Sequence, residues 1–182
     1  ELPGARAWPV DLTDHDEVAE AVGGIDSLDV LVHSAGIGEI GTVADTPAEV
    51  WRREYEINVV AVAELTRLLL PALRRAGGRV VLLNSGSGLV ARPGWGPYAA
   101  SKFALRAFAD ALRAEEAPNG VRVTSLHVGR TATDMQRHVV EQEGGTYDAD
   151  QYLRPESVAG AVMVAVTAPD DAALTELSLR PF

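Results

Sequence analysis

Short, nearly continuous apolar runs alternate along the chain with longer segments in which apolar positions recur at helical spacing. Runs of the first kind are typical of strands that are buried on both faces. The predicted strands cover residues 5–10, 28–33, 79–83, 121–126 and 174–179.

Helical patterns fill the intervals between these strands. Thr13 is a predicted N-cap, because acidic residues follow it where the helix dipole favours negative charge. Residues 46–49 form a predicted capping box with proline at the first helical position. The helix that follows should extend to about residue 76, with a bend or interruption at Pro71. Further helices are predicted over residues 97–116 and from residue 155.

Alternating strands and helices predict an α/β fold, with a parallel sheet covered by helices on both faces. Right-handed crossovers make this a Rossmann-like, doubly wound sheet, and we expect one domain over residues 1–182. Such sheets bind ligands at the carboxyl ends of their strands. Residues 33–36, 84–87 and 127–129 fall at those ends.

Composition narrows the function classes. The 182 residues are 47% hydrophobic, carry a net charge of −10 and contain no cysteine. The negative charge argues against nucleic-acid and anionic-membrane partners, and the apolar runs are too short to span a bilayer. Without cysteine there is no disulfide framework, which favours a cytoplasmic protein. Four scattered histidines and no paired carboxylates predict no metal site.

Lys102 is the only lysine among the 16 basic residues, and it lies four residues after Tyr98. On a helix this spacing places both side chains on one face. A nearby ammonium lowers the pKa of a phenol and makes it a usable acid or base near neutral pH. The ammonium is also more compact than a guanidinium. The competing interpretation is a solvated lysine on a helix surface.

Three polar residues complete the candidate chemistry. Ser85 lies at a strand end, thirteen residues before Tyr98, where its hydroxyl can bond a substrate carbonyl, and Ser87 is the competing candidate. Either serine can instead simply stabilise a turn. Asn58 lies inside the long predicted helix, where asparagine is unfavourable. A buried Asn58 predicts a local opening of the helix that holds a water, and an exposed one would carry no function.

The chain resembles the short-chain dehydrogenase/reductase (SDR) family from residue 5 to about residue 181. Asn58, Ser85, Tyr98 and Lys102 match the catalytic tetrad of that family in type and spacing. Residues 33–36 resemble its Asn-Asn-Ala-Gly turn, and residues 128–133 resemble its Pro-Gly stretch. The resemblance implies cofactor-binding roles for Asp11, Leu12, Ser34, Ala35, Gly36, Tyr98, Lys102, Gly129, Thr131 and Thr133.

The resemblance implies an NAD(P)-dependent oxidoreductase (EC 1.1.1.-) that transfers hydride between a nicotinamide and a small carbonyl or alcohol substrate. Tyr98 would be the acid in reduction and the base in oxidation. Lys102 would lower the phenol pKa and hold the nicotinamide ribose. Ser85 would position the substrate oxygen, and Asn58 would hold a relay water. The small bacterial reductases of the family favour NADP over NAD as the expected cofactor.

The chain departs from the family at three places. His33 and Ser34 replace the two asparagines of the turn, and Val128 stands where the family usually has proline. The third departure concerns the site of the cofactor's pyrophosphate. The family's first strand and Thr-Gly-x-x-x-Gly-x-Gly loop, which cradles the pyrophosphate, are absent from the sequence. The sequence matches from about the third strand onward, so we expect upstream residues in the native chain. The alternative function is a non-catalytic dinucleotide-binding or scaffold member of the same fold. A hydrolase using Ser85 is disfavoured, because no Gly-x-Ser-x-Gly elbow is present.

Two further expectations concern the substrate and the assembly. Residues 135–154 occupy the place of the family's substrate lid, with Gly144-Gly145 as its flexible point. The candidate wall residues of the pocket are Trp95, Met135, His138, Tyr147 and Tyr152. In the family, the helix at 97–116 and the long helix before it pack against another subunit. This implies a homodimer or homotetramer, although plain core burial would explain the same apolar residues.

Overall fold

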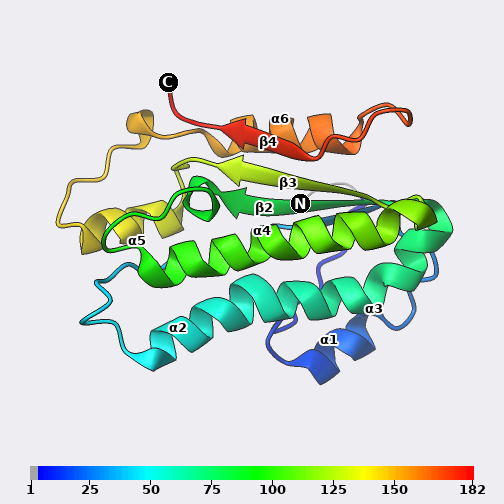
Figure 1. The fold of residues 1–182 in the computed structure, drawn as a ribbon, viewed down its shortest axis with the longest axis horizontal. Helices are drawn as coiled ribbons and strands as arrows, with labels where there is room; N and C mark the ends of the chain where they lie inside the picture. Colours follow the sequence, from blue (N-terminus) through cyan, green and yellow to red (C-terminus); the bar gives the residue numbers. More distant parts are fainter. Residues whose placement is uncertain (1–3) are drawn as a thin grey trace.

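The computed structural model describes residues 4–182 and contains a four-stranded parallel sheet (Figure 1). Neighbouring strands follow one another in sequence, in the order β1-β2-β3-β4. Their bounds are β1 (Val30–His33), β2 (Arg79–Ser85), β3 (Arg122–Val128) and β4 (Glu176–Leu179). Four of the five predicted strands are therefore present, and the α/β prediction is confirmed.

Helices cover both faces of the sheet, as predicted. The helices α3 and α4 lie on one face and α6 lies on the other (Figure 1). The α-helical bounds are α1 (His15–Val22), α2 (Ala48–Tyr55), α3 (Ala61–Ala76), α4 (Gly96–Glu116), α5 (Asp134–Gln142) and α6 (Pro155–Val166). The sequence pattern did not predict α5, which occupies the expected lid segment.

The core is densest around β2, the strand between β1 and β3. Val80, Val81 and Leu82 have no exposed surface, and Leu73 of α3 and Leu126 of β3 are equally buried. Burying a side chain of this size contributes roughly 1.5–3 kcal/mol. This packing fixes the carboxyl end of β2, where Asn84 and Ser85 lie.

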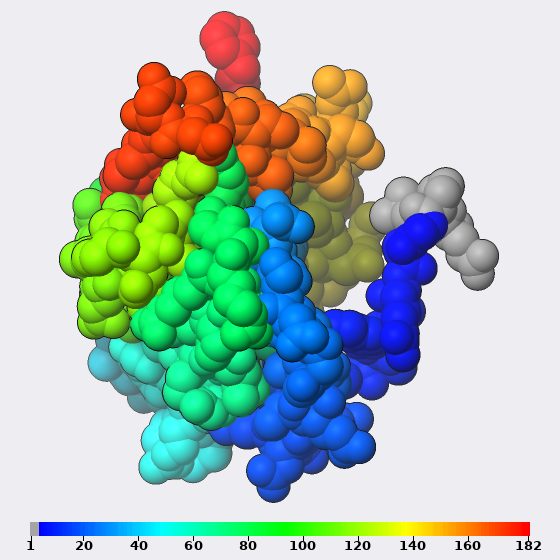
Figure 2. Space-filling model, turned by 90° about the vertical axis from the view of Figure 1, so that its right-hand side faces the viewer, coloured from blue at the N-terminus to red at the C-terminus, as the bar shows by residue number. Residues whose placement is uncertain are grey.

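The predicted strand at residues 5–10 is not formed. These residues run past the body without strand pairing, and Figure 2 shows this segment at the N-terminal, blue end standing away from the rest of the molecule. Within residues 4–182, β1 pairs only with β2, and Val32 on β1 keeps 39% of its surface exposed. A strand needs a hydrogen-bonding neighbour, and residues 5–10 pair with none of the described strands.

Two predicted helix starts are also wrong in detail. The cap of α1 is Asp14, whose carboxylate accepts a hydrogen bond from Glu17 N at 3.0 Å, and Thr13 is not the cap. At α2 the N-cap position is Pro47, without a side-chain hydrogen bond. The Thr46 hydroxyl donates instead to Thr42 O at 2.6 Å, so the capping box does not form.

The long predicted helix is interrupted at Asn58 and continuous at Pro71. A π-helical segment, Glu56–Val60, separates α2 from α3, whereas α3 continues through Pro71 as far as Gly77. Gly77 ends α3 in the left-handed conformation, with φ of 58°, which glycine adopts without a Cβ penalty. The π segment adds a residue to one turn and thereby turns Asn58 inward.

Candidate active site

Tyr98 and Lys102 lie in the first two turns of α4 and share one environment. The Lys102 ammonium lies 5.7 Å from the centroid of the Tyr98 ring. Lys102 is only 5% exposed, and Tyr98 is partly buried. The prediction that the two side chains lie together on one helix face is therefore confirmed, and the alternative of a solvated lysine is excluded.

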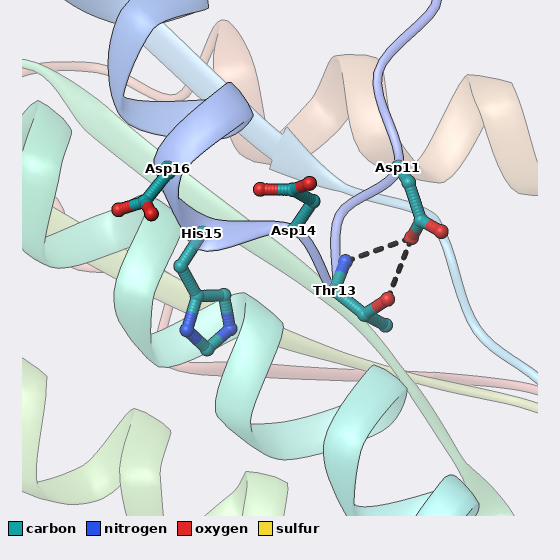
Figure 3. Close-up of a pocket in the computed structure, with 5 residues that line it drawn as sticks. All are labelled: Asp11, Thr13, Asp14, His15 and Asp16. Carbon is teal, nitrogen blue, oxygen red and sulfur yellow. Dashed lines mark hydrogen bonds between the residues drawn. The ribbon is translucent and has the colours of Figure 1, made fainter.

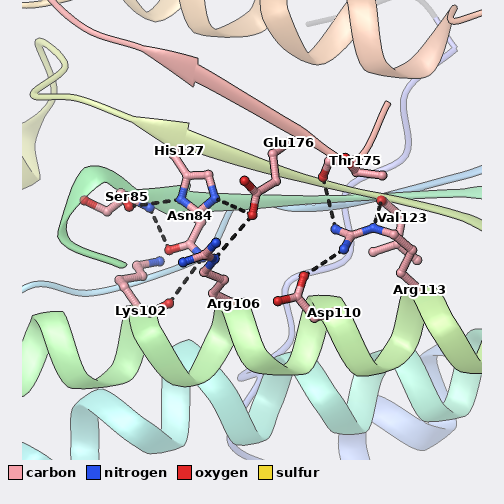
Figure 4. A network of polar contacts seen from close by, with 10 residues as sticks. All are labelled: Asn84, Ser85, Lys102, Arg106, Asp110, Arg113, Val123, His127, Thr175 and Glu176. Atoms are coloured by element: carbon pink, nitrogen blue, oxygen red, sulfur yellow. Dashed lines mark hydrogen bonds and ion pairs between the residues drawn. The ribbon is translucent and has the colours of Figure 1, made fainter. Parts of the chain in front are cut away.

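Polar contacts fasten α4 to the strands beneath it (Figure 4). Asn84 at the end of β2 donates from Nδ2 to Lys102 O at 3.2 Å. Arg106 bonds Glu176 of β4 at 3.2 Å, and Arg113 donates to Val123 O of β3 at 3.0 Å. These contacts fix the position of α4, the helix that carries Tyr98 and Lys102, relative to the sheet.

The Lys102 amine keeps hydrogen-bonding capacity. Among the described residues, Nζ donates one hydrogen bond, to Leu83 O at 3.3 Å, although an ammonium has three donors. Burial lowers the pKa of Lys102 to about 8, and the charge of Glu54 opposes this shift. Lys102 is therefore mainly protonated at neutral pH, with donors to offer.

The pKa of Tyr98 moves in the direction opposite to the expectation. Burial raises it, a hydrogen bond with the Ser85 side chain lowers it, and the charge of Glu54 raises it further. Desolvation penalises the phenolate more than the neighbouring groups stabilise it. In the described chain Tyr98 is thus a neutral phenol that can donate a proton.

The side chain that acts on the pKa of the Tyr98 phenol is Ser85 rather than Ser87. Ser85 ends β2, and its backbone N–H donates to Asn84 Oδ1 at 2.7 Å. Its hydroxyl oxygen also accepts a hydrogen bond from Ser87 N at 3.1 Å, which begins a 3₁₀ turn (Gly86–Gly88). Ser85 therefore stabilises a turn, and its side chain also acts on the pKa of Tyr98. Its role toward a substrate carbonyl stays a prediction.

Asn58 is buried, and its amide is fixed by the loop after β1. Ile37 N donates to Asn58 Oδ1 at 3.0 Å, and Asn58 Nδ2 lies 2.9 Å from Ile37 O. Nδ2 also lies 3.0 Å from the hydroxyl of Ser101, next to Lys102. Asn58 therefore connects the π segment, the loop and α4, and the predicted helix opening is confirmed.

Glu54 is a member of this site that the sequence did not indicate. It lies one turn before Asn58, has no exposed surface, and accepts a hydrogen bond from Asn58 Nδ2 at 2.6 Å. Its other oxygen accepts from Glu39 N at 2.6 Å. Burial raises the pKa of Glu54 to about 7, and the charges of Lys102 and Arg53 oppose this rise. In a helix rich in charged residues, nothing distinguishes this glutamate from a surface one.

Two glycines let the loop after β1 approach the site. A Cβ on Gly36 would lie 3.0 Å from Asn58 Oδ1 and 3.6 Å from Lys102 Nζ. A Cβ on Gly38 would lie 3.3 Å from the Tyr98 ring. Gly36 is thus beside Asn58 and Lys102, and its place in a cofactor site stays a prediction.

The remaining predicted cofactor residues fall into two groups. Leu12, Ser34 and Ala35 line a small groove of about 60 Å³. Asp11 lies in an open concavity of about 470 Å³, and its carboxylate accepts hydrogen bonds from the N–H and hydroxyl of Thr13 (Figure 3).

The second group, Gly129, Thr131 and Thr133, follows β3, and these residues form hydrogen bonds within their own loop, to α5 and to β4. Thr131 donates from its hydroxyl to Gly129 O at 3.0 Å, and Thr133 is the N-cap of α5. Gly129 N donates to Leu179 O at 2.8 Å. Within residues 4–182, no hydrogen bond links these residues to Tyr98 or Lys102.

Aromatic and cationic side chains flank the phenol. Trp95 packs edge-on against Tyr98, with ring centroids 5.9 Å apart, and the Arg130 guanidinium lies 5.6 Å from the Trp95 ring. Arg130 also forms an ion pair with Glu143, just after α5. Trp95 thus lies beside Tyr98, and its role as a wall residue of the substrate pocket stays a prediction.

The expected lid tyrosines, by contrast, contact one another. Tyr147 and Tyr152 stack with ring centroids 5.5 Å apart. His138, which was also a candidate wall residue, is exposed and lies 3.2 Å from Gln142. Met135 does lie close to the site, because a Cβ on Gly38 would meet both its sulfur and the Tyr98 ring.

The donor set suits one end of a nicotinamide dinucleotide. The Lys102 amine offers donors for ribose hydroxyls, and Gly36 leaves space beside it. Residues 4–182 contain no glycine-rich strand-to-helix loop that would hold the pyrophosphate. The same residues include no cluster of three His, Cys, Asp or Glu side chains suited to a metal ion. None of their helices has the length and apolarity needed to cross a membrane.

Comparison with known proteins identifies similar chains. A family model described as "short chain dehydrogenase" matches residues 2–144. A dehydrogenase/reductase SDR family member 7B from Bos taurus is 37% identical over 142 residues, which cover 75% of this chain and 44% of the relative. A cyclopentanol dehydrogenase from Comamonas testosteroni is 39% identical over 137 residues, covering 72% and 55%. The chain thus spans about half the length of these relatives.

The fold has close counterparts among solved structures. A short chain dehydrogenase from Burkholderia cenocepacia, crystallised in complex with NADP, superposes with a TM-score of 0.80 at 27% identity. The superposition covers 93% of this chain and 67% of that one.

Proposed function

Because the chain belongs to the short-chain dehydrogenase family, we propose that the whole protein is an NAD(P)-dependent oxidoreductase. Its reaction would transfer hydride between the nicotinamide and a small carbonyl or alcohol substrate. The observation that supports this proposal is that the Tyr98 phenol has two polar neighbours. The buried Lys102 amine lies 5.7 Å from the centroid of its ring, and the Ser85 side chain acts on its pKa.

In the reducing direction, Tyr98 donates its proton to the substrate oxygen. The raised pKa of Tyr98 keeps the phenol protonated until the oxygen becomes basic. Ser85 holds the same oxygen by a hydrogen bond and so orients the carbonyl toward the phenol. The bound cofactor supplies the hydride.

Lys102 would bind and orient the nicotinamide ribose, and Asn58 would hold a water in a proton relay from Lys102. The two amine donors that lack a partner among the described residues suit two ribose hydroxyls. The positive charge of Lys102 also stabilises the phenolate that remains after proton donation. Asn58 is the proposed holder of a water that returns the proton.

We propose NADP as the cofactor, with NAD as the alternative. Support comes from the Burkholderia cenocepacia relative of this fold, which was crystallised with NADP. Gly36, Ser34, Ala35 and Leu12 are the residues proposed to line its path along the carboxyl edge of the sheet.

Oxidation of NADPH and of NADH by full-length protein, with a panel of cyclic and linear ketones, tests the proposal. The decisive comparison is Tyr98→Phe with Tyr55→Phe, a matched removal of a hydroxyl from an exposed tyrosine of α2. General acid catalysis contributes roughly 10²–10⁴-fold, so Tyr98→Phe should lose at least about 100-fold in kcat/KM. Tyr55→Phe should retain full activity.

Equal turnover by wild type and Tyr98→Phe would refute the assigned acid. Dinucleotide binding without turnover of any ketone or alcohol would favour the non-catalytic alternative instead. Isothermal titration with NADPH and NADH separates these outcomes, because it measures binding without chemistry.

A further inference from the structure

We propose that Glu54 is a positioning residue of this site, which orients the Asn58 amide and keeps Lys102 protonated through its negative charge. This role rests on the proposed function for its catalytic consequence. The contacts themselves, and the charge coupling, are properties of the folded chain and can be measured without substrate.

Geometry gives Glu54 its first role. Its two oxygens accept hydrogen bonds of 2.6 Å from Asn58 Nδ2 and from Glu39 N, so both are engaged by donors. Ile37 N donates to Asn58 Oδ1 on the opposite side of that amide. A donor at Oδ1 and a carboxylate at Nδ2 permit only one orientation of the Asn58 side chain.

Charge gives Glu54 its second role. A fully buried carboxylate is costly unless other charges compensate it. The basic groups that act on Glu54 are Lys102 on α4 and Arg53 on its own helix. Arg53 is paired with the side chain of Glu39 at the surface. Lys102 is therefore the buried cation whose charge acts on Glu54, and each charge favours the ionised form of the other group. Asn58 lies between them in the packing, because a Cβ on Gly36 would meet both Asn58 Oδ1 and Lys102 Nζ, and Asn58 Nδ2 donates to Glu54.

Among the described residues, Tyr98 is a further titratable group on which the charge of Glu54 acts. The charge of Glu54 raises the pKa of Tyr98, whereas it also opposes the lowering of the Lys102 pKa. Ionised Glu54 therefore favours a neutral phenol and a protonated amine at the same pH. These are the two protonation states that carbonyl reduction needs.

Titration of Lys102 by NMR tests the charge coupling directly. In full-length protein labelled with [¹³C]lysine, the Lys102 Cε resonance is the one that Lys102→Arg removes. Its midpoint should lie near pH 8 in the wild type. In Glu54→Gln the midpoint should fall by about one pH unit, because the opposite charge is lost while an acceptor for Asn58 is kept.

Glu49→Gln is the matched control. Glu49 lies on the same helix, and its ion pair with Arg52 is exposed, so the Lys102 midpoint should not move. An unchanged midpoint in Glu54→Gln would overturn the proposal, as would equal shifts in both variants. Because neither cofactor nor turnover is involved, failure of the proposed function would leave this result unaffected.

Two further measurements keep the inference testable. If Glu54→Gln does not fold, the wild-type Lys102 resonance should still show a smaller inflection near pH 7, where Glu54 titrates. Absence of that inflection would overturn the coupling. If the variant folds and turns over ketones, the basic limb of its kcat/KM profile should shift to lower pH with the Lys102 midpoint. A lower kcat/KM at every pH, without that shift, would indicate a merely structural role.

Discussion

Protonation of His33 should destabilise the fold, because this histidine is buried at the end of β1. His33 is 7% exposed, and its Nε2 lies 2.8 Å from the hydroxyl oxygen of Thr66. Thr66 donates its own hydroxyl proton to Val62 O at 2.7 Å. The hydroxyl oxygen must therefore accept from His33, which places the single ring proton on Nε2 of a neutral imidazole.

The magnitude follows from the pKa of His33, which burial lowers from 6.5 to about 4. The unfolded chain binds a proton at this ring near pH 6.5, whereas the folded chain does not until about pH 4. One pKa unit corresponds to about 1.4 kcal/mol, so the folded state should lose about 3 kcal/mol as the pH falls through this window. Above pH 6.5 both states are neutral at this ring, and the contribution is constant.

Urea unfolding of wild type and His33→Gln between pH 7.5 and pH 4 measures this contribution. The difference in unfolding free energy should change by about 3 kcal/mol in favour of the variant as the pH falls. His138→Gln is the control, because His138 is exposed on α5 and should follow the wild type. Parallel curves for wild type and His33→Gln would refute the reasoning.

Two further predictions concern Lys102, which we propose to be part of the catalytic machinery, and the loop beside it. Gly36→Ala places a methyl carbon 3.0 Å from Asn58 Oδ1, and should lower the urea-unfolding free energy by about 1 kcal/mol relative to Gly24→Ala, where a Cβ meets nothing within 4 Å. Equal stabilities would contradict this packing. Lys102→Arg should lower kcat/KM at least about 100-fold, because Lys102 is only 5% exposed and the larger guanidinium does not fit in its place. Arg67→Lys, at an exposed position of α3, should retain activity. Turnover of Lys102→Arg close to that of wild type would contradict the need for a compact cation.

The fold was predictable wherever the apolar pattern had a single explanation. The strands β2 and β3 are buried on both faces, so their apolar runs were unambiguous. The segment at residues 5–10 has the composition of a strand, yet pairing depends on a neighbour that a local pattern does not specify. The helix α5 was missed because its surroundings contain few apolar residues at helical spacing.

The sequence predicted those members of the candidate site whose residue type is itself unusual at its position. Tyr98, Lys102, Ser85 and Asn58 are polar groups at positions where the pattern called for helix or strand, and the structure brings them together. Thr131 and Thr133, by contrast, were inferred from a stretch with family resemblance. Their observed contacts are local, so their roles toward a cofactor stay predictions.

Glu54 shows why burial, rather than residue type, limits such predictions. Glutamate is usually a surface residue, so residue type alone placed Glu54 on the outside of its helix. The sequence prediction for Asn58 was that it holds a water, and this gave no reason to expect a buried carboxylate beside it. The carboxylate is enclosed by the π segment and by the loop after β1, which approaches it through Ile37 and Glu39. The same enclosure explains why the Tyr98 pKa was predicted in the wrong direction: the expectation counted the nearby ammonium and omitted desolvation and a second buried charge. A neutral phenol beside a protonated amine is therefore a property of the whole enclosure, and Glu54 is the side chain through which it can be altered without touching either group.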